Sequence, residues 1–294
     1  MKIGIGTAQF GLNYGVSNQQ GKTSPLEVKN ILNLALDHDI CVLDTAPAYG
    51  ESEDVLGKIL PPGNSLKIIT KTPVLNKSII NREDRKLIRE TFYQSLKKLN
   101  QSSIDGLLVH QVQDILAEGG EYLFEEMLQL KQKNLIRKIG VSVYNADQID
   151  QVLSRYSIDL IQLPINIFDQ RLLKNGYLEK LHNLGIEIHA RSLFLQGLLL
   201  MNLEELPPYF TPYRTCLETY YKTLDKNGIS PLKSALDFIQ NISQVNCIIV
   251  GINTAEQLQE ILGTFNETER LNSDFFESFS IENELIINPS NWVI

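Results

Sequence analysis

The sequence predicts an α/β protein, a single-domain (β/α)8 TIM barrel that covers residues 1–294. Eight short β-like runs alternate with eight helix-like segments, and no strand-rich or linker segment separates them. That alternation over roughly 250 residues is the pattern of a closed parallel barrel. In addition, four residues with complementary chemistry lie at or just after the ends of three of these runs. A barrel gathers its ligand-binding residues at that edge.

The expected strands are short runs of β-branched and other apolar residues, separated by helix and turn signals. In chain order they cover residues 3–7, 40–43, 67–70, 104–109, 139–142, 158–163, 186–190 and 247–250.

Capping signals mark the ends of several helices. The run Ser24-Pro25-Leu26-Glu27 combines an N-cap with proline at the first helical position. A helix that begins near Ser52 is stopped by Pro61-Pro62, and Ser230-Pro231 and Thr254 precede the last two helices. Apolar residues at helical spacing indicate the remaining helices. They are Ile88, Phe92, Leu96 and Leu99; Leu123, Met127 and Leu130; Ile149 and Val152; and residues 177–182.

One segment departs from this rhythm, a long excursion at residues 192–229 after the seventh strand. A barrel loop of this size is expected over the C-terminal face, where ligands bind. Its aromatic residues are Tyr209, Phe210, Tyr213, Tyr220 and Tyr221. Two interpretations are open: an aromatic wall over the site, or a helix-containing loop that packs on the barrel.

A doubly wound sheet is the alternative fold, and the glycine-rich run at residues 4–11 superficially suggests its dinucleotide fingerprint. The third glycine falls at Gly11 instead of position 9, and no acidic residue follows at the expected distance of about 20. The sequence therefore favours the barrel.

Composition excludes several classes of function. A net charge of −8 argues against a nucleic-acid or anionic-membrane surface. No apolar run approaches the roughly 18 residues that span a bilayer, and no signal-peptide core is present. Three cysteines without CxxC spacing indicate reduced thiols and a cytoplasmic protein. The four histidines lack metal-ligand spacing, and no nucleophile elbow is present, so neither a metal site nor a hydrolase is predicted.

The candidate catalytic residues are Asp44, Tyr49, Lys71 and His110. A phenol has a pKa near 10, and a neighbouring ammonium favours its ionised form. Asp44 would keep Lys71 charged in a partly dry site, and His110 would hydrogen-bond a carbonyl oxygen from the other side. Such a set protonates an oxygen while another group attacks the carbon.

These residues lie in motifs that resemble the aldo-keto reductase family. The matching segments are Leu43-Asp44-Thr45-Ala46-Pro47-Ala48-Tyr49-Gly50-Glu51-Ser52-Glu53, Ile69-Thr70-Lys71, Asp105-Gly106-Leu107-Leu108-Val109-His110-Gln111, Ile139-Gly140-Val141-Ser142 and Ile161-Gln162-Leu163. The resemblance implies a barrel enzyme that transfers hydride from a nicotinamide cofactor to an aldehyde or ketone, including sugar-derived ones, with Tyr49 as general acid. It also implies NADP(H) in preference to NAD(H).

The resemblance further implies a set of cofactor contacts, with Ser142 and Gln162 at the nicotinamide carboxamide. The implied contacts are Thr7, Asp44, Ser142, Gln162, Arg191, Ser192, Leu193, Gly251, Asn253 and Gln257.

Two positions and one loop depart from the family pattern. Val143 stands where the family usually has asparagine, and Arg191 where an aromatic residue commonly stacks on the nicotinamide. Arg191 could stack on the ring, turn to the pyrophosphate, or turn outward to an acidic residue of the excursion. The loop at residues 251–257 lacks the basic residues that often hold the 2′-phosphate of NADP, so we expect only weak discrimination against NAD(H).

Two other functions are compatible with the same residues. One is a cofactor-sensing regulatory subunit, which would not need the acid. The other is a sugar isomerase or dehydratase in which Arg191 binds a phosphate. The predicted ligand is a small molecule, with neither nucleic acid nor membrane as partner, and the sequence carries no signal of an oligomeric state.

Overall fold

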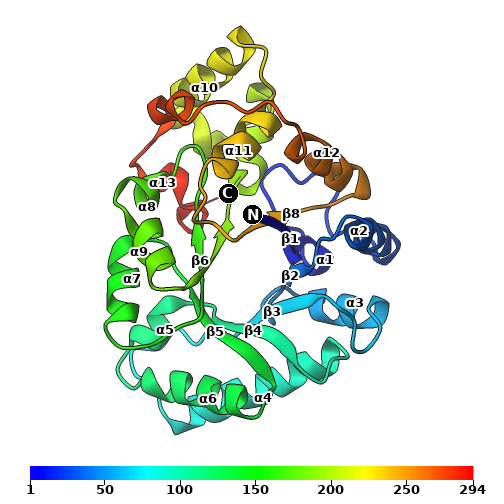
Figure 1. Cartoon of the computed structure of the whole chain (residues 1–294), viewed down its shortest axis with the longest axis vertical. Helices are drawn as coiled ribbons and strands as arrows, with labels where there is room; N and C mark the ends of the chain where they lie inside the picture. The colour runs from blue at the N-terminus through cyan, green and yellow to red at the C-terminus, as the bar shows by residue number, and fades with distance from the viewer. Residues whose placement is uncertain (294) are drawn as a thin grey trace.

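Eight parallel strands close into a barrel in chain order, as the sequence predicts (Figure 1). The computed structural model describes residues 1–293. The strands are β1 (Lys2–Gly6), β2 (Val42–Asp44), β3 (Lys67–Lys71), β4 (Ile104–Val109), β5 (Ile136–Ser142), β6 (Leu160–Pro164), β7 (Glu187–Arg191) and β8 (Cys247–Gly251).

Helices surround the strands and connect each strand to the next (Figure 1). The principal helices are α2 (Pro25–Asp37), α3 (Ser52–Ile59), α4 (Arg82–Lys98), α6 (Glu121–Gln132), α7 (Ala146–Leu153), α9 (Tyr177–Asn183), α11 (Pro231–Gln240) and α12 (Ala255–Phe265). Short additional helices occupy the loops: α1 (Ala8–Gly11), α5 (Val112–Leu116) and α8 (Arg171–Lys174).

The predicted caps are confirmed at three helices. The side chains of Ser24, Ser230 and Thr254 each accept a hydrogen bond from the backbone three residues later. Such caps satisfy amide groups that the first helical turn leaves unpaired. Inside the barrel, a small apolar cluster that includes Val42, Ile69 and Leu108 fills the space between the strands.

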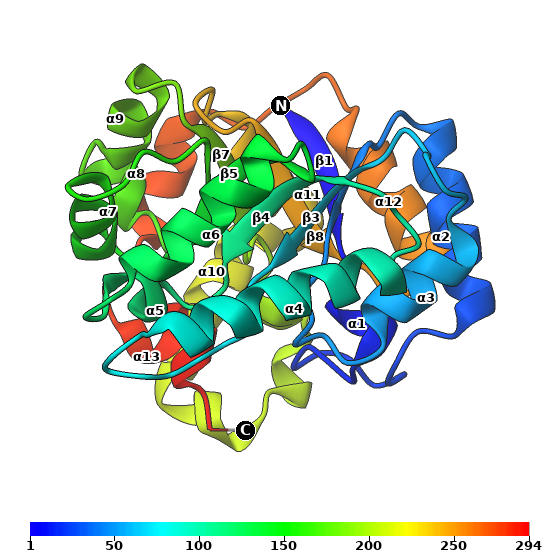
Figure 2. The ribbon, with the colours of Figure 1, turned by 90° about the horizontal axis from the view of Figure 1, so that it is seen from below.

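The excursion at residues 192–229 contains three 3-10 turns, η1 (Leu195–Leu200), η2 (Leu203–Glu205) and η3 (Pro208–Tyr213), followed by α10 (Arg214–Lys226). Figure 2 shows the yellow-green start of this excursion and α13 (Glu284–Ile287) at the end of the barrel where the strands finish.

The five aromatic residues named above pack against the rest of the fold instead of forming a wall over the site. Phe210 is fully buried with its ring 4.8 Å from Trp292, and Tyr220 packs edge-on against Phe168 and Phe279. The hydroxyl of Tyr209 donates to a backbone carbonyl of the C-terminal segment. None of the five aromatic residues lines the cavity described below. The packing interpretation is therefore correct for these five residues, whereas Phe194, near the start of the excursion, lines the cavity.

The sequence pattern predicts no helix or strand after residue 265. This segment forms η4 (Ser273–Phe279), α13 and η5 (Pro289–Asn291), and contacts the excursion through the aromatic residues named above. Within residues 1–293, no helix has the length and apolar character needed to cross a bilayer.

Candidate active site

A cavity of about 630 Å³ opens at the carboxyl ends of the strands. All four candidate catalytic residues line it. Strand register explains their convergence: Asp44 pairs with Ile69, and Lys71 with Leu108. Because side chains two residues apart in a strand point to the same side, Asp44, Lys71 and His110 share the barrel interior.

Lys71 is the centre of the hydrogen-bond network. Its ammonium lies 2.6 Å from Asp44 Oδ2 and 3.0 Å from the Thr45 carbonyl oxygen, and it donates to Tyr49 Oη at 3.2 Å. Gln162 donates to the other oxygen of Asp44 at 2.8 Å. Since Tyr49 accepts from a cation, its own proton is free to be donated into the cavity.

A close approach of two loops holds Tyr49 in place. A Cβ atom at Gly11 in α1 would lie 1.9 Å from the Tyr49 carbonyl oxygen, so only glycine fits there. The loop that carries the phenol therefore rests directly on the loop after β1.

Burial sets the protonation states of these groups. Burial raises the pKa of Tyr49 above its ordinary value, although Lys71 acts in the opposite direction. The expectation that Lys71 brings this pKa below its usual value is therefore wrong in net direction. Burial lowers the pKa of Lys71, but Asp44 and Tyr49 together raise it above its usual value, so the amine stays charged.

His110 is neutral at physiological pH. Burial, and then the charge of Lys71, lower its pKa to about 4. Its Nδ1 atom is buried without a hydrogen-bond partner, and its ring meets that of Tyr49 edge-on at 5.8 Å. A neutral imidazole carries one donor and one acceptor nitrogen, so it can bond a substrate oxygen without adding charge.

Arg191 points along the cavity wall and not outward. Its guanidinium carbon lies 4.2 Å from the centre of the Tyr144 ring, and its two terminal nitrogens donate to the Val143 carbonyl and the Ser192 hydroxyl, each at 3.2 Å. Within residues 1–293 it makes no ion pair, so the outward interpretation is wrong. Val143 itself is fully buried.

The other implied cofactor contacts fall into two groups. Those that line the cavity are Ser142, Gln162, Ser192, Leu193, Gly251, Asn253 and Gln257. Thr7 differs: it is fully buried, does not line the cavity, and donates its hydroxyl to the Asp44 carbonyl at 3.0 Å. Its side chain braces the end of β2, so the expectation of a direct contact is corrected.

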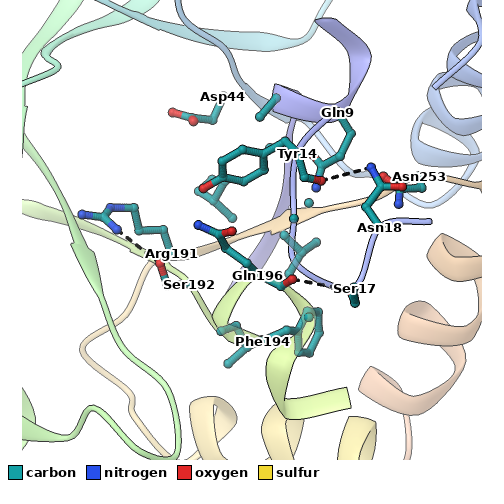
Figure 3. A pocket seen from close by; sticks show the side chains of 18 of the residues that line it. Gln9, Tyr14, Ser17, Asn18, Asp44, Arg191, Ser192, Phe194, Gln196 and Asn253 are labelled. Atoms are coloured by element: carbon teal, nitrogen blue, oxygen red, sulfur yellow. Dashed lines mark hydrogen bonds between the residues drawn. The ribbon is translucent and has the colours of Figure 1, made fainter. Parts of the chain in front are cut away.

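The loops after β1 and β7 meet beside the cavity (Figure 3). Ser17 donates to the Gln196 carbonyl at 3.4 Å. Ser192, Leu195 and Gln196 all have positive φ angles of 46° to 61°, which are strained for non-glycine residues. This turn therefore holds three non-glycine residues in an uncommon backbone conformation beside the cavity.

Sequence reasoning missed several residues that line the cavity. They are Gln9, Tyr14, Gln111, Tyr144 and Phe194. For four of them the available signal was position, because Gln9, Gln111, Tyr144 and Phe194 each lie within three residues of a strand end. Tyr14 lies eight residues after β1. Within residues 1–293, no group of histidine, cysteine and acidic side chains could hold a metal ion.

Comparison with known proteins places these features in context. A family model described as the Aldo/keto reductase family matches residues 2–281. Aldo-keto reductase YhdN of Bacillus subtilis is 32% identical over 178 residues, which cover 58% of this chain and only 52% of that protein. D-arabinose 1-dehydrogenase of Saccharomyces cerevisiae is 23% identical over 280 residues, covering 86% of this chain and 82% of that protein.

A solved structure agrees in fold. The holo form of an aldo-keto reductase of Bacillus halodurans matches with a TM-score of 0.74 and 20% identity, covering 95% of this chain and 91% of the other.

Proposed function

The chain belongs to the aldo/keto reductase family, and from that premise we propose that it reduces an aldehyde or ketone to an alcohol with a nicotinamide cofactor. The observation that carries the proposal is the hydrogen bond from Lys71 to Tyr49 Oη inside the cavity. A buried cation that donates to a phenol stabilises the phenolate left behind when the proton departs.

Each catalytic side chain has one task in the proposed reaction. Tyr49 donates its proton to the carbonyl oxygen, and Lys71 stabilises the negative charge that develops on the phenol. Asp44 holds Lys71 in place and balances its charge. His110 hydrogen-bonds the carbonyl oxygen in its neutral form. When bound, the nicotinamide cofactor supplies the hydride.

The residues at the cavity suit a dinucleotide. Ser142 and Gln162 lie at paired positions on β5 and β6, where their polar side chains can bind a carboxamide. Arg191 and Ser192 lie on the β7 side, the region where barrels commonly bind phosphate. Gln9 Oε1 and Asn253 Oδ1 are buried without partners, so they can bond ligand hydroxyls. The family resemblance alone implies NADP(H) in preference to NAD(H).

The proposed substrate is a small, sugar-derived carbonyl compound. Polar and aromatic side chains near the catalytic set, including Tyr14, Gln111 and Tyr144, suit a polyhydroxylated ligand. The name of the yeast relative also points to a sugar. We further propose a cytoplasmic location, supported by three free cysteines.

A carbonyl panel tests the function. The purified chain should oxidise reduced nicotinamide cofactor when aldoses or other small carbonyl compounds are added, and the reaction should be lost in Tyr49→Phe. A regulatory subunit would bind cofactor without turnover. An isomerase or dehydratase would convert a sugar phosphate without consuming cofactor. Either of those results would contradict the proposal.

A further inference from the structure

We propose that this chain selects NAD(H) over NADP(H) through two carboxylates, Glu27 and Glu260, beside the start of α12. The inference rests on the proposed function, since it assigns the form of the cofactor. It departs from the preference that the family resemblance implies.

The position of the adenosine end follows from the shape of the cavity. The catalytic set lies at the β2–β4 side, and barrels bind phosphate at the loops after β7 and β8. The cavity continues past these loops to Gln257, Glu260 and Ile261 on α12. A dinucleotide with its nicotinamide near Tyr49 and its pyrophosphate near β7 and β8 therefore brings the adenosine ribose to α12.

At the N-terminus of α12, the amides of Ala255 and Gln257 already donate to side chains of the protein. Glu27 of α2 accepts a hydrogen bond from the Ala255 amide at 2.6 Å. The Asn253 amide donates to the Gln257 side chain at 2.9 Å, and the Gln257 amide donates to Thr254 at 3.2 Å. A helix N-terminus binds a phosphate through free amides, and here a carboxylate takes that place.

The charged residues that line the cavity also favour NAD(H) over NADP(H). Among the residues that line it, only Lys71 and Arg191 are cationic. Lys71 is paired with Asp44, and Figure 3 shows Arg191 on the side of the cavity opposite Asn253. At the α12 side the charged lining residue is Glu260. From residue 251 to residue 269 the chain has no lysine or arginine.

A 2′-phosphate and a 2′-hydroxyl differ sharply in this setting. The phosphate would bring close to two negative charges near Glu260, with Glu27 behind the α12 N-terminus, and no residue that lines the cavity on this side carries a positive charge. A hydroxyl can instead donate to a carboxylate oxygen. The side-chain amides of Gln9 and Asn253 can hydrogen-bond either the phosphate or the hydroxyl. The Gln9 side chain lies against Gly251. The carboxylates therefore decide the preference.

Equilibrium binding of NADH and NADPH to the full chain tests the proposal directly. We expect the Kd for NADH to be at least about tenfold lower at moderate salt. Equal affinities, or tighter binding of NADPH, would overturn the inference. Competition by 5′-AMP and by adenosine 2′,5′-bisphosphate isolates the adenosine end, and 5′-AMP should be the stronger competitor.

Charge removal identifies the residues responsible. Glu27→Gln keeps an oxygen that can accept from Ala255, and Glu260→Gln keeps the side-chain size. In the double variant the ratio of the two Kd values should fall about tenfold, by improved NADPH binding. Asp37→Asn removes the same charge from the far end of α2, about 15 Å from Glu27, and should leave the ratio unchanged. A double variant with the wild-type ratio would refute the role of the carboxylates.

The outcome is separable from that of the proposed function. A chain that binds NADH preferentially but reduces no carbonyl compound would support the inference while contradicting the proposed reaction. A chain that reduces carbonyl compounds equally well with both cofactors, at equal affinities, would support the proposed reaction and contradict the inference about cofactor choice.

Discussion

Arg191 stacks on Tyr144, with the guanidinium carbon 4.2 Å from the ring centre. The geometry is that of a cation–π contact. Hydrogen bonds to the Val143 carbonyl and the Ser192 hydroxyl fix the guanidinium from two further sides. A cation is thereby held at the end of β7, beside the proposed nicotinamide site.

Replacing Arg191 with tyrosine should change the balance between the two redox states of the cofactor. The oxidised nicotinamide ring is cationic, so a neighbouring guanidinium disfavours it relative to the reduced ring. Arg191→Tyr should therefore tighten binding of the oxidised form more than that of the reduced form, and slow any turnover limited by product release. Dissociation constants for both forms provide the measurement. Equal shifts for the two forms, or no shift, would mean that Arg191 does not act on the ring.

Removing the phenol should abolish reduction and spare cofactor binding. Tyr49→Phe is expected to lower kcat by at least about a hundredfold, the usual contribution of a positioned acid, with cofactor affinity changed only a few-fold. Near-normal turnover would contradict the assignment of Tyr49 as the acid.

Lys71→Met should be equally damaging to kcat, because Tyr49 would lose the cation that stabilises its phenolate. It should also lower stability by about 3–5 kcal/mol, since Asp44 would be left buried without its partner. Turnover and thermal unfolding of the Lys71→Met and Tyr49→Phe variants separate the two effects: the lysine variant should lose both, and the tyrosine variant only turnover. A lysine variant with wild-type stability would argue against a buried ion pair.

The catalytic constellation could be predicted from sequence because it depends on topology alone. Asp44 and Lys71 each end a strand, His110 directly follows one, and the carboxyl ends of parallel strands share one face. Caps such as Ser24 were predictable for a similar reason, since they act within four residues.

Other features depend on tertiary structure and could not be predicted from the sequence. Tyr14 enters the cavity from a loop without periodicity, eight residues after the end of β1. The charge on Lys71 suggested a lowered pKa for Tyr49, whereas burial, which no local pattern reveals, dominates. Thr7 sits at a strand end, yet its side chain faces the neighbouring strand instead of the cavity.

The pH dependence of the two reaction directions should differ. Reduction needs protonated Tyr49, and burial holds the pKa of this phenol above its usual value near 10. The rate of carbonyl reduction should therefore stay level from about pH 6 to pH 9. Oxidation of the alcohol needs the phenolate and should rise throughout that range. A fall in reduction near pH 7 would indicate a different acid.

Acid should destabilise the chain in two windows. The pKa of His110 is lowered to about 4 from 6.5, and that of Glu187 to about 2 from 4.5, where the contact with His189 at 2.9 Å is the largest cause and Lys138 contributes. A group whose folded pKa is depressed stabilises above its unfolded pKa and loses that stability as the pH falls to the folded value. His110 therefore costs stability between about pH 6.5 and pH 4, and Glu187 between about pH 4.5 and pH 2.

Thermal unfolding across these ranges checks the assignment. His110→Phe should flatten the loss of stability between pH 6.5 and pH 4, where the wild-type histidine contributes on the order of 3 kcal/mol. Glu187→Gln should leave that window unchanged and flatten only the one below pH 4.5. His38 is exposed on the surface, so His38→Phe serves as the matched control. This variant should lose stability in both pH ranges as the wild type does. If His110→Phe unfolds with the same pH dependence as the wild type, the buried neutral imidazole is not the cause.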